Sequence, residues 1–209
     1  MQNKRQALNE RKKTMPNNNA NHFVTGNARM SFVHLNAPYA HQQDGEAKYS
    51  VTVLVPKTDT KTKARIDAAI QAATQMGIST KWNGARPPVI ATPIYDGDGV
   101  RPNGEAFGAE CKGCWVFTAS SKADRKPRIV NPQLQDILDP NEIYSGMWGR
   151  VGVDAYPYNV SGKRGIAFGL TNVQKLADGD PLGSSTTAED DFGAPVEVGA
   201  INPMTGQPL

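Results

Sequence analysis

The sequence predicts a mainly β protein with one helix between its strands and a polar segment at each end. Apolar and polar side chains alternate, as in half-buried strands, in residues 23–36, 48–55, 114–119 and 148–175. Only residues 60–76 repeat apolar side chains at helical spacing, and both ends hold few apolar residues. We therefore expect a disordered basic arm over residues 1–22, one domain over residues 23–176 and a disordered acidic tail over residues 177–209.

The longest alternating stretch predicts a hairpin of two strands, residues 148–158 and 165–175, joined by a turn rich in glycine. One face of the first strand is ordinary core, with Val151, Val153 and Ala155. The other face carries three aromatic residues and an arginine: Trp148, Arg150, Tyr156 and Tyr158, with Asp154 among them. Such a face can stack bases beside a phosphate partner, or it can cover a second hydrophobic layer. The residues leave both interpretations open.

Other segments add aromatic and basic residues to this picture. Trp115 and Phe117 share one face of the strand at residues 114–119, and Lys126 and Arg128 follow in the next turn. This interleaving is the pattern that a single-strand groove needs. Tyr39 lies in a loop after the first strand and is a candidate base contact, and Lys163 and Arg164 extend the charge at the hairpin turn.

The helix over residues 60–76 is expected to pack on the sheet without taking part in any chemistry. Thr58 or Asp59 can cap its start, and Gly77 stands where a C-terminal cap belongs. The long Gly- and Pro-rich connection over residues 82–111 should be mostly irregular, and connections of this length are usually functional or mobile.

Charge divides the chain into a basic body and an acidic tail. Residues 1–175 hold all 23 Lys and Arg against 14 acidic residues, a net charge of +9, and residues 176–209 hold the other 6 acidic residues, a net charge of −6. This layout is typical of a polyanion-binding protein that carries its own competitor, although tails also serve only to solubilise. Without a long apolar run or a signal segment, we expect a cytoplasmic protein that contacts no membrane.

Few residues suggest catalysis or metal binding. Cys111 and Cys114 have the spacing of half a zinc site, but no second ligand pair accompanies them. Asp96, Asp98 and Glu105 make a metal-dependent nuclease conceivable, although Asp-Gly pairs are usually plain turns. We therefore expect no cofactor and no metal, and an enzyme is the weaker class of function.

Several motifs recur in one order from about Gly26 to Phe192: NARMSFVHLNAP, AKYSVTVLVPKTDTKTKARIDAAI, YDGDGVRP, PQLQDILDPNEIYSGMWGRVGVDAYPYN, GIAFGLTNVQKLADGDPLG and TTAEDDF. Together they resemble the tailed-phage single-stranded DNA-binding proteins, long catalogued as a phage domain of unknown function. The resemblance implies an OB-type barrel that binds single-stranded DNA without marked sequence preference, in phage DNA replication, recombination or repair, inside the infected bacterial cell.

On this resemblance, bases would stack on aromatic side chains, and arginines and lysines would neutralise phosphates. The stacking candidates are Trp115, Phe117, Trp148, Tyr156 and Tyr158, and the phosphate candidates are Lys126, Arg128, Arg150, Lys163 and Arg164. Glu189, Asp190, Asp191 and Phe192 resemble the acidic, aromatic-tipped tail through which such proteins recruit replication or recombination partners. The alternative functions are the nuclease and a structural or adaptor phage protein that binds no DNA. A homo-oligomer is a further possible assembly.

Overall fold

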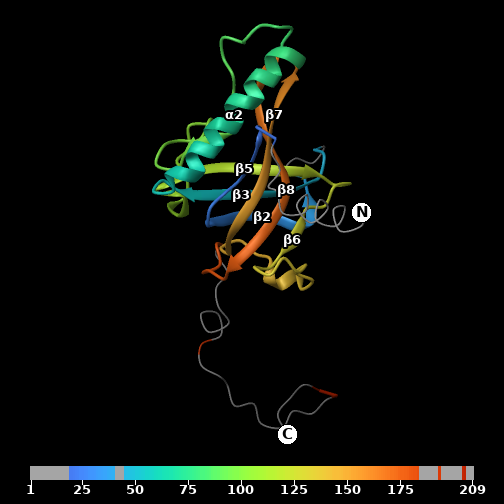
Figure 1. Ribbon diagram of the computed structural model, residues 1–209. Coiled ribbons are helices and arrows are strands. Elements are labelled where there is room, and N and C mark those ends of the chain that lie inside the picture. Colours follow the sequence, from blue (N-terminus) through green and yellow to red (C-terminus); the bar gives the residue numbers. More distant parts are fainter. Residues whose placement is uncertain (1–18, 41–44, 184–192, 194–203, 206–209) are drawn as a thin grey trace, which may run out of the picture.

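Five strands close into a barrel. The computed structural model describes residues 19–40, 45–183, 193 and 204–205. The barrel strands are β2 (Ala28–Tyr39), β3 (Lys48–Pro56), β5 (Cys114–Lys122), β7 (Trp148–Val160) and β8 (Lys163–Ala177). They pair in the order β7-β2-β3-β5-β8, and β7 also pairs with β8, which closes the ring (Figure 1). Only the β5–β8 contact is parallel among these pairs. A five-stranded barrel with this connectivity is an OB fold, so the predicted fold class is confirmed.

Short elements extend the barrel at its edges. Strand β1 (His22–Val24) pairs with β7, β4 (Ile94–Asp96) pairs with β5, and β6 (Arg128–Val130) pairs with β8. Two single turns of 3-10 helix, η1 (Ala109–Cys111) and η2 (Pro140–Glu142), lie in the connections before β5 and β7.

The barrel interior is filled by β-branched and aromatic side chains. Val51, Val53 and Val55 of β3 are fully buried, as alternation along the strand predicts. Phe23, Phe117 and Phe168 meet edge to face, with ring centroids 5.1–6.1 Å apart. Such pairs add to the burial of their large apolar area, so this cluster anchors the core.

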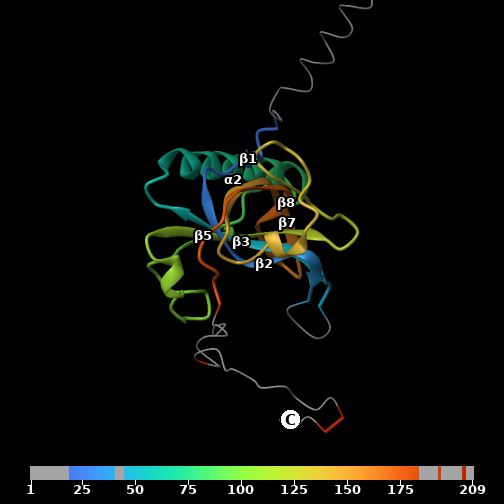
Figure 2. The same cartoon turned by 90° about the horizontal axis from the view of Figure 1, so that it is seen from below.

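Helix α2 (Thr60–Thr80) crosses one side of the barrel and packs along β7, as Figures 1 and 2 show. Its start is as predicted, because the Asp59 side chain accepts a hydrogen bond from the Thr62 N–H. Its end is not, because the helix passes through Gly77 to Thr80. Gly77 is needed for packing instead: a Cβ there would lie 2.7 Å from the Trp82 ring. The glycine therefore admits the buried indole, whose Nε1 donates to the Tyr158 carbonyl at 3.0 Å.

Strand β2 departs from the predicted alternation at Phe32. Its backbone has φ 45° there, and its register with β3 shifts between Ser31 and His34. A bulge of this kind re-aims side chains, because one extra residue moves the following ones to the opposite face. Phe32 is 55% exposed as a result, whereas Met30 and Leu35 are buried.

The β7–β8 hairpin confirms the predicted strands at residues 148–158 and 165–175, and both strands run further into the turn. Val160 pairs with Lys163 around a two-residue turn in which Ser161 and Gly162 both have positive φ. Val151, Val153 and Ala155 are buried on the predicted core face. Beyond β8, residues 178–183 return along the barrel, where Arg29 donates to the Asp180 carbonyl and Leu182 packs on Leu54 and Val116.

Candidate nucleic-acid interface

A cleft of about 680 Å³ lies on the outer surface of β2, β3 and β5. Four hydroxyl side chains line its floor: Ser31, Ser50, Thr52 and Thr118. Thr52 and Thr118 face each other across the strands, and their hydroxyl oxygens are 2.9 Å apart. A hydroxyl both donates and accepts a hydrogen bond, so this floor can match base edges of either polarity.

Aromatic side chains stand around that floor. Phe32 comes from the β2 bulge, Tyr95 from β4 and Phe107 from the loop before η1. Phe32 is 55% exposed and Tyr95 is 38% exposed, although large apolar groups are normally buried. The rings of Tyr95 and Phe107 are 6.2 Å apart and tilted by 42°. Three rings beside an open cleft make a surface on which planar ligands can stack.

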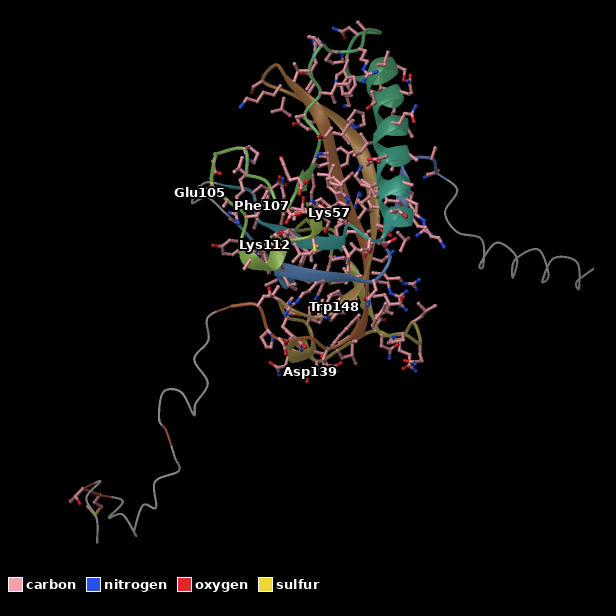
Figure 3. The ribbon with its side chains drawn as sticks, turned by 90° about the vertical axis from the view of Figure 1, so that its left-hand side faces the viewer. Lys57, Glu105, Phe107, Lys112, Asp139 and Trp148 are labelled. Carbon is pink, nitrogen blue, oxygen red and sulfur yellow. The ribbon has the colours of Figure 1, made fainter. Side chains whose placement is uncertain are left out.

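Arg101 supplies positive charge to the same wall. Its guanidinium lies 5.4 Å from the centre of the Phe107 ring, a cation–π distance, and its Nε has no hydrogen-bond partner within the described residues. Its backbone is held in a turn, since the Arg101 N–H donates to the Glu105 carbonyl at 2.7 Å. Figure 3 shows Glu105 and Phe107 on this loop, which stands off the barrel strands.

Lys57 ties the aromatic wall to the end of β3. Its Nζ donates to Asp96 at 2.5 Å and to Asp98 at 2.7 Å. These hydrogen bonds lower the pKa of both carboxyl groups and raise the pKa of Lys57. The three side chains therefore stay charged over an extended pH range.

The residues predicted on the outer face of β7 lie away from the cleft. Arg150 and Arg128 line a separate groove of about 290 Å³, which shares no lining residue with the cleft. Arg150 is bonded to Gln174, and Arg128 to Asp136 at 2.9 Å. Tyr156 is 44% exposed on the same strand face, and Trp148 is partly buried against Gly179. Figure 3 shows Trp148 well apart from Phe107.

The prediction that Phe117 stacks bases is wrong, because this ring is 1% exposed and packs inside the barrel, although the residue is also among those that line the cleft. Trp115 is on the same inner side of β5, with Lys57 and Lys63 at 5.2 Å and 4.8 Å from its ring centre. The alternation of the strand was predicted correctly, but the aromatic face points inward. The opposite face, with Val116 and Thr118, borders the cleft.

Three other predicted residues, Tyr39, Lys163 and Arg164, lie outside the lining of the cleft. The exposed Tyr39 stacks on His34 at the end of β2, with ring centres 4.5 Å apart. Lys163 and Arg164 lie at the hairpin turn, where the Arg164 carbonyl accepts from the Ala91 N–H, two residues before Pro93 of the cleft. Tyr158 is half-buried against Gly165 of the same turn. Lys126 is exposed on the connection before β6, and Glu189, Asp190, Asp191 and Phe192 lie outside the described residues.

Reasoning from the sequence missed Phe32, Tyr95, Arg101 and Phe107. Three of them are in or beside the long irregular connection over residues 82–111, whose length was the available signal. Phe32 gave none, since alternation predicted it on the face of the buried Met30.

The candidate metal ligands are engaged elsewhere. Asp96 and Asp98 bind Lys57, and Glu105 accepts from the Asn103 amide at 2.9 Å. Burial raises the pKa of the Cys111 thiol to about 11, which disfavours the thiolate that binds zinc. Across residues 19–40 and 45–183, no group of three or more His, Cys, Asp or Glu side chains is placed to hold a metal ion. In the same ranges no helix has the length and apolar character to cross a membrane.

Comparison with known proteins gives consistent matches. A family model described as the ssDNA-binding protein of Enterobacter phage Enc34 matches residues 21–200. The structure of the bacteriophage Enc34 single-stranded DNA-binding protein in complex with ssDNA is 28% identical, with a TM-score of 0.66 over 81% of this chain and 97% of that chain. A second structure of the bacteriophage Enc34 single-stranded DNA-binding protein gives a TM-score of 0.61 at 28% identity, over 85% of this chain and 96% of that chain.

A more distant structure, gp2.5 of bacteriophage T7, a single-stranded DNA-binding protein, is 14% identical with a TM-score of 0.56, over 87% of this chain and 98% of that chain. At this identity the likeness concerns the fold alone. Among curated proteins no sequence matches this chain. The match to the family model covers most of the chain, the described barrel included, and the chain belongs to the family of the Enterobacter phage Enc34 ssDNA-binding protein.

Proposed function

We propose that the protein binds single-stranded DNA without marked sequence preference, in phage DNA replication, recombination or repair, and that the cleft on β2, β3 and β5 is its binding site. The observation that carries this proposal is the set of rings around a hydroxyl floor: the exposed Phe32 and Tyr95, and the partly buried Phe107. Membership of the Enc34 family supports the nucleic-acid class of ligand. The same face of OB folds binds oligonucleotides in general.

Stacking would supply most of the affinity. Each base stacked on an aromatic ring contributes about 1–3 kcal/mol, whatever the base. The hydroxyl floor would accept any base edge, and Arg101 would face a phosphate. Duplex DNA would bind less well because its bases are already stacked and paired, so the rings cannot reach their faces.

The predicted residues take different places in this scheme. Tyr39, Lys163 and Arg164 would extend the path of the strand beyond the cleft. Arg128, Arg150, Trp148 and Tyr156 lie on other surfaces, where only a longer strand that wraps around the barrel would reach them. Short oligonucleotides should therefore depend on the cleft alone.

The test is a titration of a fluorescently labelled short oligonucleotide with the wild-type protein and with Phe32→Ala and Tyr95→Ala. Each substitution should weaken binding by about 5- to 150-fold, the equivalent of one lost stack. Tyr156→Ala is the matched control, an exposed ring outside the cleft, and should bind as the wild type does. Unchanged affinity in both cleft variants, or a loss confined to Tyr156→Ala, would move the site to the outer face of β7.

We also propose a binding protein rather than an enzyme, acting in the cytoplasm of the infected host cell. The proteins that this chain is similar to are named for DNA binding. Incubation of the protein with DNA and magnesium tests the point, since cleavage that disappears in Asp96→Ala would favour the nuclease. The acidic residues 189–191 with Phe192 remain the proposed contact for replication or recombination partners.

A further inference from the structure

The aromatic wall of the cleft is built on a connection with little regular structure. Between the end of β4 at Asp96 and the start of β5 at Cys114, the chain forms turns, one isolated bridge between Val100 and Ala106, and the three-residue η1. Arg101 and Phe107 both lie on this connection, and Tyr95 immediately precedes it. A wall of this kind needs attachments to the barrel if its rings are to keep their places.

Lys57 is the centre of such an attachment. It follows β3, and its Nζ bridges the carboxylates of Asp96 and Asp98, while its backbone N–H donates to the Gly113 carbonyl at 2.9 Å. Asp98 in turn accepts from the Gly113 N–H at 2.9 Å. Both ends of the connection are therefore bonded to Lys57, one end through its side chain and the other through its backbone N–H. Figure 3 shows Lys57 between the strands and the loop that carries Phe107.

The backbone packs closely at the same point. The Gly97 N–H donates to the Cys114 carbonyl at 2.9 Å, and a Cβ on Gly97 would lie 2.0 Å from the Cys111 carbonyl oxygen. The connection thus fits against the start of β5 only where residue 97 has no side chain.

Lys57 is poorly placed to contact a phosphate itself. Two of its three donors are taken by carboxylates, so a phosphate there would meet two negative charges beside one positive charge. Lys57 is also absent from the lining of the cleft. Its Nζ lies 5.2 Å from the centre of the Trp115 ring, and the side chain is 29% exposed.

We propose that Lys57, Asp96 and Asp98 form a latch that positions Tyr95, Arg101 and Phe107 for stacking, and that all three are positioning residues for single-stranded DNA binding. The latch rests on the proposed function. The proposal makes Asp96 and Asp98 necessary for binding a polyanion. Charge complementarity alone would predict that acidic residues near the site weaken binding. A preorganised wall raises affinity because the rings need not be ordered when DNA arrives.

The latch and a purely electrostatic role predict opposite changes in DNA affinity for Asp98→Asn. Asp98→Asn removes a negative charge close to the DNA path, so electrostatics alone predicts tighter binding. Loss of the latch predicts weaker binding, by about 3- to 10-fold, through a loosened wall. Asp96→Asn should act in the same direction.

For Lys57→Met, the salt dependence of DNA binding distinguishes a positioning role from a direct phosphate contact. A lysine that contacts a phosphate contributes about 0.7 to the slope of log affinity against log salt concentration for single strands. As a latch residue, Lys57 should contribute nothing to that slope, so Lys57→Met should weaken binding about equally at every salt concentration. Lys63→Met is the matched control: Lys63 also lies over Trp115, but its partner is Asp67 on its own helix, and the variant should keep wild-type affinity.

The experiment is a titration of the full chain and these four variants with one labelled oligonucleotide across salt concentrations, with hydrogen exchange of residues 97–113 measured in parallel. We expect weaker binding by Asp98→Asn, Asp96→Asn and Lys57→Met, an unchanged slope and faster exchange over this segment. The double variant Lys57→Met/Asp98→Asn should bind no more weakly than the weaker single variant, because both break one unit.

Two results would overturn the latch: wild-type or tighter binding by both Asp variants, or a slope reduced by about 0.7 in Lys57→Met. If one Asp variant fails to fold, the other decides. Failure of the proposed function looks different, because the wild type itself would then bind no single-stranded DNA or would bind it independently of Phe32 and Tyr95.

Discussion

At the scale of the residue, neighbouring positions on β5 have opposite roles. Phe117 fills the barrel, and Thr118 points outward to the cleft floor. The same holds on β2, where Met30 is core and Phe32 is exposed by a bulge. Side chains alternate between faces at every residue of a strand, so a shift of one position moves a side chain from the core to the outer face.

Phe117→Ala should therefore lower stability rather than affinity. Truncating a buried Phe costs about 3–5 kcal/mol, since it removes apolar contacts and leaves a cavity. Urea unfolding should show this loss, while the folded fraction should bind the short oligonucleotide as the wild type does. Phe32→Ala is the matched substitution on an exposed ring, and its free energy of unfolding should change by less than about 1 kcal/mol. A specific loss of affinity in folded Phe117→Ala would contradict the placement of this ring.

At the scale of the element, the start of α2 is fixed by Asp59. One carboxylate oxygen accepts from the Thr62 N–H at 3.0 Å and the other from the Thr62 hydroxyl at 2.5 Å. Thr62 in turn accepts from the Gly26 N–H at 2.7 Å, which joins the helix to the segment between β1 and β2. The cap therefore connects a local signal in the sequence to the barrel.

The cap should make stability depend on pH in acid. The hydrogen bonds from Thr62 lower the pKa of Asp59 from its ordinary value of 3.8. The stability that the carboxylate contributes is therefore complete above about pH 4 and is lost as the pH falls through the lowered folded-state pKa. Asp59→Asn keeps a good capping side chain that does not titrate. Thermal unfolding should show similar stability for the two proteins at pH 7 and a smaller loss for Asp59→Asn below pH 4; parallel curves would contradict this role of the cap.

At the scale of the whole molecule, the division of charge sets the response to salt. The basic body, residues 1–175, carries a net charge of +9, and residues 184–209 hold four of the acidic residues without any Lys or Arg. Residues 178–183 are bonded to the barrel through Arg29 and Ser145. Leu182 packs on Val116, which lines the cleft. The acidic segment therefore follows directly after a residue that is packed beside the cleft.

Removal of residues 184–209 should increase affinity for single-stranded DNA at low salt, because the truncated protein has a net charge of +7 instead of +3. The gain should shrink as salt rises, since screening shortens the reach of charges to about 10 Å at 0.1 M. Titrations of both proteins over a range of salt concentrations measure it. A chain of full length with Glu189, Asp190, Asp191 and Glu197 all replaced by Gln or Asn is the control for charge without truncation. Equal affinities at all salt concentrations would contradict a competing role for this segment.

Much of the fold followed from local patterns. Alternation predicted β3, β5 and the β7–β8 hairpin, and Asp59 marked the start of the helix, because these signals depend on neighbours in sequence. Patterns failed where a distant residue decided the outcome. From the sequence alone, Gly77 predicts a helix end, whereas in the structure it makes room for the Trp82 ring. Alternation on β5 pairs Trp115 with Phe117, but nothing local says which face of the strand meets water.

The sequence by itself determined a mainly β domain with one helix, a basic body with an acidic end, and the family to which the motifs pointed. These properties depend on composition and on contacts between near neighbours. Only the tertiary structure shows the candidate site, because the cleft combines the bulge at Phe32, the cross-strand pair of Thr52 with Thr118, and a connection bonded to Lys57. Those residues meet through barrel closure, and the spacing of residues along one strand does not encode which strands become neighbours.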